Sequence, residues 1–303
     1  MWEATLYKGP CTTAQNDGPL IFLMLIGIMN HRSSNITYLV LRLAVAMCFL
    51  GHGAFGIVTK ASWCNYLGVI GLSTAQSYQL MPLIGSIDIL LGLCMIFYPV
   101  RAVPAWLVCW GFVTALMRPL SGEPVAELVE RAGNFGAPLA LLILSGLPAN
   151  FAGWFKLMGL PGQVDPATRQ RLTNCLKCTV FLLLAGHGWL NLYGKEALLK
   201  QYGSLGFEDP LQIAQLVGIG EITAAFLVLA KPLRPLLFAL FLWKVGSELF
   251  YQHYPLLEWI ERGGSYGALL ALWMVTGRTA WDFYPGGGWN GRRLVRHQPR
   301  MVG

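Results

Sequence analysis

The chain has 303 residues, of which 55% are hydrophobic and only 12% are charged, and its mean hydropathy is +0.51. Soluble domains usually carry about 25% charged residues, so this composition excludes an ordinary soluble domain and indicates an integral membrane protein. The formal net charge of +7 fits basic loops held on the cytoplasmic side and an affinity for anionic lipid headgroups. It is poor evidence for a nucleic-acid partner, and we expect none.

The first segment, residues 1–35, contains an apolar stretch that is too short to cross a membrane. Residues 19–29 make about 11 positions, whereas a spanning helix needs roughly 20. No small-residue cleavage signature follows a basic start, so a secretory signal peptide is not indicated. We expect a short interfacial or re-entrant helix in this segment.

Apolar stretches of about spanning length recur along the rest of the chain. They predict eight transmembrane helices, over residues 36–58, 77–98, 103–117, 135–155, 175–193, 211–230, 233–250 and 266–283. The predicted fold class is therefore an all-α integral membrane protein. Four spans fall in each half, residues 36–160 and 175–284, with a polar cytoplasmic linker over 161–174 and a basic cytoplasmic tail over 285–303.

The two halves carry the same polar motifs in the same order. A Gly-His-Gly triplet centred on His52 returns at His187, 135 residues later. Further pairs match with an offset that drifts only to 131: Lys60 and Lys195, Asp88 and Glu221, Glu127 and Glu258, Glu130 and Glu261, and Arg131 and Arg262. The pattern indicates an internal duplication with nearly constant loop lengths.

Basic residues set the expected orientation, because loops rich in Lys and Arg stay on the cytoplasmic side. With both termini inside, 15 of the 22 Lys and Arg residues fall in cytoplasmic segments or helix ends. Each half has an even number of predicted spans, so both would insert the same way up, as parallel repeats. The expected location is the cytoplasmic (inner) membrane of a bacterium, where lipids are the surrounding partners.

The histidines are the first candidate site residues, because a strongly polar group at membrane depth must face a partner, a cavity or a ligand. Gly53 and Gly188 follow His52 and His187, and each would let a neighbouring backbone or a flat ligand approach closely. Two imidazoles at one depth could hold a b-type haem. The simpler alternative is a hydrogen bond from each histidine to the carboxylate of its own half, Asp88 or Glu221.

Asp88 and Glu221 are the second pair of candidates, since a carboxylate near the middle of an apolar helix is expensive to leave unpaired. Each could carry a proton or hydrogen-bond a quinone-like head group, which would make it catalytic. Each could equally be a structural carboxylate that clamps two helices. Lys60 and Lys195 lie at the outer ends of their helices, where snorkelling to the interface is the expected role.

A third shared element covers residues 124–131 and 255–262. Proline begins each segment, and a glutamate and an arginine follow four residues apart. This spacing predicts a short amphipathic helix with an internal ion pair, over the outer mouth of the bundle. The helix could be a solvated face without function, or a lid that brings Glu130, Arg131, Glu261 and Arg262 near the histidines.

One pair of charges breaks the symmetry. Lys244 and Glu248 are four residues apart within a predicted span, whereas the matching positions are Val113 and Met117. An i,i+4 ion pair inside the membrane is therefore expected only in the second half, which favours that half as the active one. No zinc pattern or Gly-rich phosphate loop occurs, and we expect no metal site.

These motifs together resemble the DoxX-like superfamily of membrane proteins. The shared features are a Gly-rich first helix that ends at Lys60 or Lys195, an acidic second helix and a closing Glu-Arg-x-Gly element. The likeness covers roughly residues 36–150 and 175–280, although members commonly have a single four-helix unit. The superfamily includes the DoxD type, the small membrane subunit of thiosulfate:quinone oxidoreductase.

The resemblance implies a membrane subunit that passes electrons to the quinone pool beside a redox partner protein. A histidine would then hydrogen-bond a quinone carbonyl and a carboxylate would deliver the proton. The alternative from a different class is a non-catalytic scaffold subunit or a carrier for a small molecule. The sequence leaves open whether the chain is an enzyme.

Overall fold

The computed structural model describes residues 18–250 and 254–276, and this part of the chain is built from helices. The longer helices are α1 (Gly18–Ile57), α3 (Thr74–Phe97), α4 (Ala102–Leu120), α6 (Ala132–Ser145), α7 (Pro166–Tyr193), α9 (Pro210–Ala230), α10 (Arg234–Ser247) and α12 (Gly263–Val275). The short ones are α2 (Trp63–Gly68), α5 (Ala126–Glu130), α8 (Glu196–Ser204), α11 (Pro255–Glu261) and the 3-10 helices η1 (Phe151–Phe155) and η2 (Glu248–Phe250). The all-α class expected from the composition is confirmed.

Five helices of the described residues are long and apolar enough to cross a membrane: residues 33–57 of α1, and α3, α4, α7 and α9. Two of the other predicted spans are shorter than expected, since helices α6 and α10 have 14 residues each, below the roughly 20 that a straight span needs. Helix α12 has 13 residues, and the end of the predicted span over 266–283 and the tail over 285–303 lie outside the described residues. Helix α6 ends at Ser145 because Gly146 has a positive φ of 72° and Pro148 follows.

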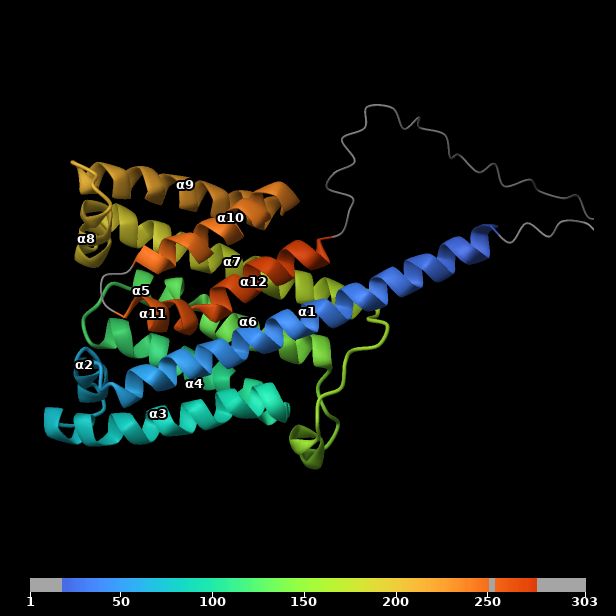
Figure 1. Ribbon diagram of the computed structural model, residues 1–303, viewed down its shortest axis with the longest axis horizontal. Helices are drawn as coiled ribbons and strands as arrows, with labels where there is room; N and C mark the ends of the chain where they lie inside the picture. The colour runs from blue at the N-terminus through green and yellow to red at the C-terminus, as the bar shows by residue number, and fades with distance from the viewer. Residues whose placement is uncertain (1–17, 251–253, 277–303) are drawn as a thin grey trace, which may run out of the picture.

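The N-terminal helix differs from the expectation. Helix α1 runs without a break for 40 residues from Gly18, so the apolar stretch over 19–29 is the first part of α1 and does not form a separate short helix. Helical residues on both sides carry the hydrogen-bond ladder across residues 30–35, which removes the expected boundary. Figure 1 shows this first part of α1 extending beyond the other helices.

Local signals explain several helix ends. Ser73 and Gln76 form a capping box at the start of α3, and Asp165 accepts from the backbone N–H of Thr168 at the start of α7. Helix α7 ends at Gly194, which has the left-handed conformation that glycine adopts without strain. These ends fix the lengths of the helices that carry the site.

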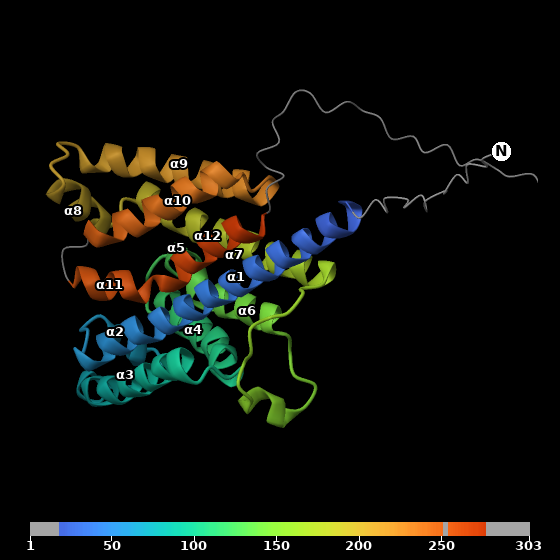
Figure 2. The same ribbon diagram turned by 45° about the vertical axis from the view of Figure 1, so that its right-hand side comes forward.

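The last helices of each half pack against the first helix of the other half. Helices α11 and α12 contact α1, whereas α5 and α6 contact α7. Figures 1 and 2 show α1 to α3 on one side, α7 to α10 on the other, and α5, α6, α11 and α12 between them. The short helices α2, α5, α8 and α11 gather at one end of the bundle. The two halves are therefore joined by exchanged elements.

Glycines allow these crossings. A Cβ on Gly51 would lie 2.2 Å from the backbone nitrogen of Glu261, and a Cβ on Gly186 would lie 2.2 Å from that of Glu130. No side chain fits at such a distance, so only glycine permits α11 and α5 to cross α1 and α7 this closely. The first helix of each half thus makes the same close contact with a short helix of the other half.

Candidate functional site

His52 occupies the polar end of a cavity in the first half, which we call cavity 1. Its Nδ1 donates to Oδ2 of Asp88 on α3 at 2.7 Å, so the predicted pairing within this half is present. The centre of its ring lies 4.5 Å from that of Trp63 on α2 and 6.5 Å from that of Trp110 on α4, which is nearly perpendicular to it. Because Nδ1 is engaged, Nε2 is the nitrogen left to meet a ligand, and 16% of the side chain is exposed.

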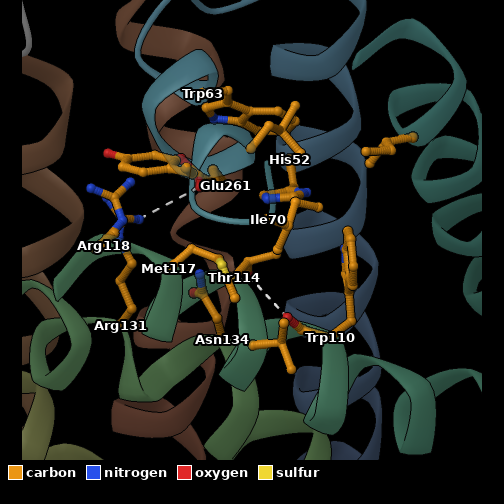
Figure 3. Close-up of a pocket in the computed structure, with 14 residues that line it drawn as sticks. His52, Trp63, Ile70, Trp110, Thr114, Met117, Arg118, Arg131, Asn134 and Glu261 are labelled. Atoms are coloured by element: carbon orange, nitrogen blue, oxygen red, sulfur yellow. Dashed lines mark hydrogen bonds and ion pairs between the residues drawn. The ribbon is translucent and has the colours of Figure 1, made fainter. Parts of the chain in front are cut away.

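Cavity 1 has a volume of about 130 Å³ and combines aromatic walls with a few polar groups (Figure 3). Its apolar lining comes mainly from Trp63, Leu67, Ile70, Ile84, Trp110, Val113 and Met117. The polar lining includes His52, Arg118 and Asn134, together with Glu261 from the second half. Nε1 of Trp110 is buried without a hydrogen-bond partner among the described residues. A flat, largely apolar group with acceptor atoms fits this lining.

His187 is held more tightly in the second half, beside what we call cavity 2, of about 380 Å³. Its Nδ1 donates to Oε2 of Glu221 on α9 at 2.5 Å, again as predicted, and Trp243 donates to the other oxygen at 3.0 Å. Asn191 lies 3.2 Å from the same Nδ1, and Tyr202 donates to Asn191 at 2.7 Å. Only 6% of the His187 side chain is exposed, so its contacts are mostly with the protein.

The two histidines line different cavities and do not face each other across one. This arrangement does not favour the haem that both imidazoles could share. The flanking glycines contact backbone: Gly53 packs against the carbonyl oxygen of Gly85, and Gly188 against that of Gly218. They serve helix packing and not the close approach of a flat ligand.

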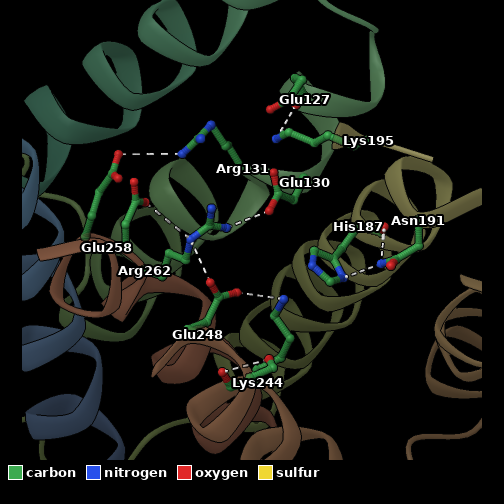
Figure 4. A network of polar contacts seen from close by, with 12 residues as sticks. Glu127, Glu130, Arg131, His187, Asn191, Lys195, Lys244, Glu248, Glu258 and Arg262 are labelled. Carbon is green, nitrogen blue, oxygen red and sulfur yellow. Dashed lines mark hydrogen bonds and ion pairs between the residues drawn. The ribbon is translucent and has the colours of Figure 1, made fainter. Parts of the chain in front are cut away.

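The Glu-Arg elements are buried and exchange ion pairs between the halves, which corrects the expectation of a solvated face. Arg262 donates to Glu130 at 2.6 Å, and Arg131 lies 3.5 Å from Glu261 (Figure 4). The expected internal pair is the weaker contact, with 3.9 Å between Arg262 and Glu258. The helix spacing allowed an i,i+4 pair, but the neighbouring half offers carboxylates at shorter range.

The two lysines follow the same exchange. Lys60 lies 2.6 Å from Glu258, and Lys195 lies 2.5 Å from Glu127. The lysine of each half therefore contacts the first glutamate of the Glu-Arg element in the other half. Snorkelling to the interface is not needed to explain their positions, since about 30% of each side chain is exposed and the ammonium group is paired.

Opposing effects set the pKa values of the buried glutamates in these elements. Burial by itself raises the pKa of Glu261, but the positive charges of Arg131, Lys60 and His52 outweigh it and hold the pKa at about 2. Burial likewise raises the pKa of Glu130, and Arg262 and Lys195 bring it well below its usual range. Both glutamates are therefore ionised at neutral pH.

The predicted pair of Lys244 and Glu248 is present at 2.9 Å, with both side chains 1% exposed. Arg262 lies 2.9 Å from the second carboxylate oxygen of Glu248, which connects the pair to the exchanged network (Figure 4). The matching Val113 and Met117 instead line cavity 1. The charges therefore fill, in the second half, the place where the first half has an apolar wall.

An open cavity of about 930 Å³, the vestibule, lies at the end of the bundle where the short helices gather. Its lining includes Lys60, Glu123, Lys195, Glu196 and Lys200. Tyr66, Arg118 and Arg131 line both the vestibule and cavity 1. The vestibule and cavity 1 therefore share a wall.

Sequence reasoning missed Trp63, Tyr66, Arg118, Glu123 and Asn134. These residues do not repeat: the positions that match Tyr66 and Arg118 hold Gln201 and Leu249. A search for duplicated polar residues cannot find them. The sequence offered two signals. Arg118 directly follows an apolar stretch, and two aromatic residues, Trp63 and Tyr66, come soon after the first predicted span.

Among the described residues, no group of three or more His, Cys, Asp or Glu side chains could hold a metal ion. Fold and site together define a helical protein with five helices, among the described residues, that are long and apolar enough to span a membrane. It has two cavities, each lined by a histidine that is hydrogen-bonded to a carboxylate. Comparison of the chain with protein-family models, with curated proteins and with solved structures finds no match.

Proposed function

We propose that this protein binds a quinone in cavity 1 and works as a membrane subunit that exchanges electrons with the quinone pool. The observation that carries the proposal is the accessible imidazole of His52, which Asp88 anchors and Trp63 covers. A quinone ring is flat and apolar and bears two carbonyl acceptors. Cavity 1 offers aromatic walls for such a ring, Nε2 of His52 as a donor, and the Asn134 amide as a second polar group.

The hydrogen bond to Asp88 gives His52 a specific role. The carboxylate accepts from Nδ1 and so fixes the ring orientation and leaves Nε2 facing the ligand. Nε2 donates to a carbonyl oxygen when the ring also holds a proton at Nε2. The carboxylate also stabilises the positive charge of the imidazole whenever His52 holds a second proton. His52 can therefore both position the ring and supply a proton to it.

The exposed fraction of the two histidines favours the first half as the ligand site, in contrast to the sequence argument from Lys244 and Glu248. His52 is 16% exposed, whereas His187 is 6% exposed. Asn191 and Glu221 both lie within hydrogen-bond distance of Nδ1 of His187, whereas Nδ1 of His52 contacts Asp88. The charged pair of the second half then supports structure around cavity 2.

The proposed setting is the cytoplasmic membrane of a bacterium, with eight spans in two parallel repeats and both termini inside. Helices α6, α10 and α12 would complete the five longer spans. The matched motifs and the reciprocal contacts of Gly51 with Glu261 and of Gly186 with Glu130 support the repeats. The excess of basic residues at the opposite end from the vestibule supports the orientation. A partner redox protein would supply or remove the electrons.

The test is direct binding of ubiquinone-1 to the detergent-purified protein, followed by quenching of tryptophan fluorescence, with quinone extraction from the same sample. We expect His52→Ala to weaken binding about tenfold, since it removes a hydrogen bond and a stacked ring. Asp88→Asn should weaken it less. His187→Ala is the matched control and should leave binding unchanged.

Equal effects of His52→Ala and His187→Ala, or no quenching at all, would reject the proposal for cavity 1. A non-catalytic scaffold predicts that these changes lower only the free energy of unfolding. A small-molecule carrier predicts uptake of a solute into proteoliposomes without any redox partner. The binding and stability measurements together separate the three classes.

A further inference from the structure

We infer that Tyr66 and Glu123 form a proton relay that connects the vestibule with the ligand in cavity 1. The inference rests on the proposed function and adds the route by which protons reach the ring. It depends on contacts that occur in the first half alone.

Tyr66 lies in the wall between the two spaces, since it lines both cavity 1 and the vestibule. Its hydroxyl donates to Oε1 of Glu123 at 2.6 Å. Glu123 lines the vestibule, and 32% of its side chain is exposed. One hydrogen bond therefore joins a carboxylate that lines the vestibule to the hydroxyl of a tyrosine that also lines cavity 1.

Arg118 holds this pair in place. Its guanidinium lies 4.9 Å from the centre of the Tyr66 ring and donates to Oε2 of Glu123 at 3.1 Å. It also donates to Glu127 at 3.2 Å, and Glu127 in turn meets Lys195. These contacts leave Oε1 of Glu123 to the hydroxyl, so the geometry of the relay is set by fixed neighbours.

Tyr66 stays protonated at neutral pH, as a relay hydroxyl must. Burial, together with the hydrogen bond to Glu123, outweighs the nearby charge of Arg118 and raises the pKa of Tyr66 to about 12. The hydroxyl therefore always has a proton to give and a lone pair with which to accept another.

The proton transfer balances. Two electrons from a partner redox protein reduce the ring, and each carbonyl oxygen must gain one proton. Glu123 first takes a proton from water in the vestibule. The O–H bond of Tyr66 then breaks as an O–H bond forms on the nearer ring oxygen, and Glu123 gives its proton to the Tyr66 oxygen. His52 supplies the other ring oxygen and regains its proton afterwards.

The second half lacks the relay. The positions that match Tyr66 and Glu123 hold Gln201 and Tyr254, and Gln201 donates to the backbone carbonyl of Ser247 at 2.8 Å. Gln201 is also the single residue that lines both the vestibule and cavity 2 among those described. An amide held in this way does not pass a proton on, so the relay serves cavity 1.

The test measures proton uptake by the full-length protein in liposomes loaded with ubiquinone-1. A deazaflavin photosensitiser supplies the electrons after a light flash, and a pH-indicator dye records the protons. We expect Tyr66→Phe and Glu123→Gln to slow uptake about tenfold or more, because general acids typically contribute at least 100-fold. Binding of ubiquinone-1, followed by fluorescence quenching, should change less than about twofold, since neither change removes His52.

Two matched controls sharpen the result. Glu196→Gln makes the same chemical change in a vestibule carboxylate that pairs with Lys200 and does not line cavity 1. Tyr254→Phe removes a tyrosine hydroxyl, as Tyr66→Phe does, but in the second half, at the position that matches Glu123. Both should take up protons at the wild-type rate. Tyr66→Phe keeps the ring under Arg118, and its unfolding temperature shows that it is folded.

Proton uptake at the wild-type rate in either Tyr66→Phe or Glu123→Gln, with ubiquinone-1 still bound, would contradict the relay but not the proposed function. Equal slowing by Glu196→Gln would also overturn it, because the effect would then belong to the charge of the vestibule. Absence of ubiquinone-1 binding in the wild-type protein would reject both proposals together.

Discussion

Cavities 1 and 2 occupy matching places in the two halves, yet their histidines have different surroundings. His52 has one polar partner, Asp88, and its ring lies 4.5 Å from that of Trp63, whereas His187 contacts Glu221 and Asn191. The position that matches Asn191 in the first half is Gly56, which has no side chain to offer. The comparison teaches that a histidine and carboxylate pair present in both halves is more exposed or more buried according to neighbouring residues that the halves do not share.

The exchanged ion pairs show the opposite behaviour, because both halves keep them. Arg131 with Glu261 and Arg262 with Glu130 are the same contact made twice. Such pairs require both partners, since a single buried charge left alone is strongly destabilising. The halves therefore differ at their cavities and are alike where they meet.

The largest expected effect concerns the charges that only the second half has. Lys244→Val leaves Glu248 buried with one partner fewer, and we expect it to lower the free energy of unfolding by about 3–5 kcal/mol. The double change to Val and Met, the residues at positions 113 and 117, removes both charges and should cost less. Unfolding of the three proteins in detergent measures the difference. A double variant less stable than Lys244→Val would contradict this account.

The next effect tests what the halves share. Gly51→Ala and Gly186→Ala each place a Cβ against backbone at 2.2 Å, and both should destabilise the fold by about 3 kcal/mol. Gly220→Ala is the control, since nothing lies within 4 Å of its added Cβ. Similar losses at the two positions would support equivalent crossings. A loss at one position only would show that the halves are not packed alike.

A smaller effect separates the two histidines. His187→Ala removes one partner each from Glu221 and Asn191 in a buried site, and we expect a cost of about 1–3 kcal/mol. His52→Ala should cost less, because 16% of its side chain is exposed against 6% for His187, and the position that matches Asn191 is a glycine. Chemical denaturation of both variants ranks them. The reverse order would undo the distinction between an accessible and a locked histidine.

The smallest expected effect is a pH dependence of the exchanged pairs. The pKa of Glu261 lies at about 2, below its ordinary value of 4.5, so its contribution is complete above pH 4.5 and is lost as the pH falls through about 2. Glu261→Gln should therefore flatten the fall in unfolding temperature between pH 5 and pH 2. Glu130→Gln should act in the same direction. If the unfolding temperature fell equally with pH in the wild type and in both variants, the exchanged ion pairs would not contribute to stability in this way.

Much of the local structure could be predicted from the sequence. The composition predicted an all-helical, membrane-type protein, and the motif spacing predicted the partners of His52 and His187 correctly. These predictions succeeded because an apolar stretch and a polar group within it are constrained by local physics: the backbone bonds within its own helix, and a buried polar group needs a neighbour.

Tertiary structure alone decided how the halves meet and which histidine is more exposed. The pairing of Arg131 with Glu261 joins residues 130 positions apart, and no helix spacing specifies a contact at that range. Likewise, the contacts among Tyr66, Arg118 and Glu123 join a short helix, the end of a long helix and a loop. Sequence periodicity reports on one helix at a time, whereas burial and charge pairing depend on which helices pack together.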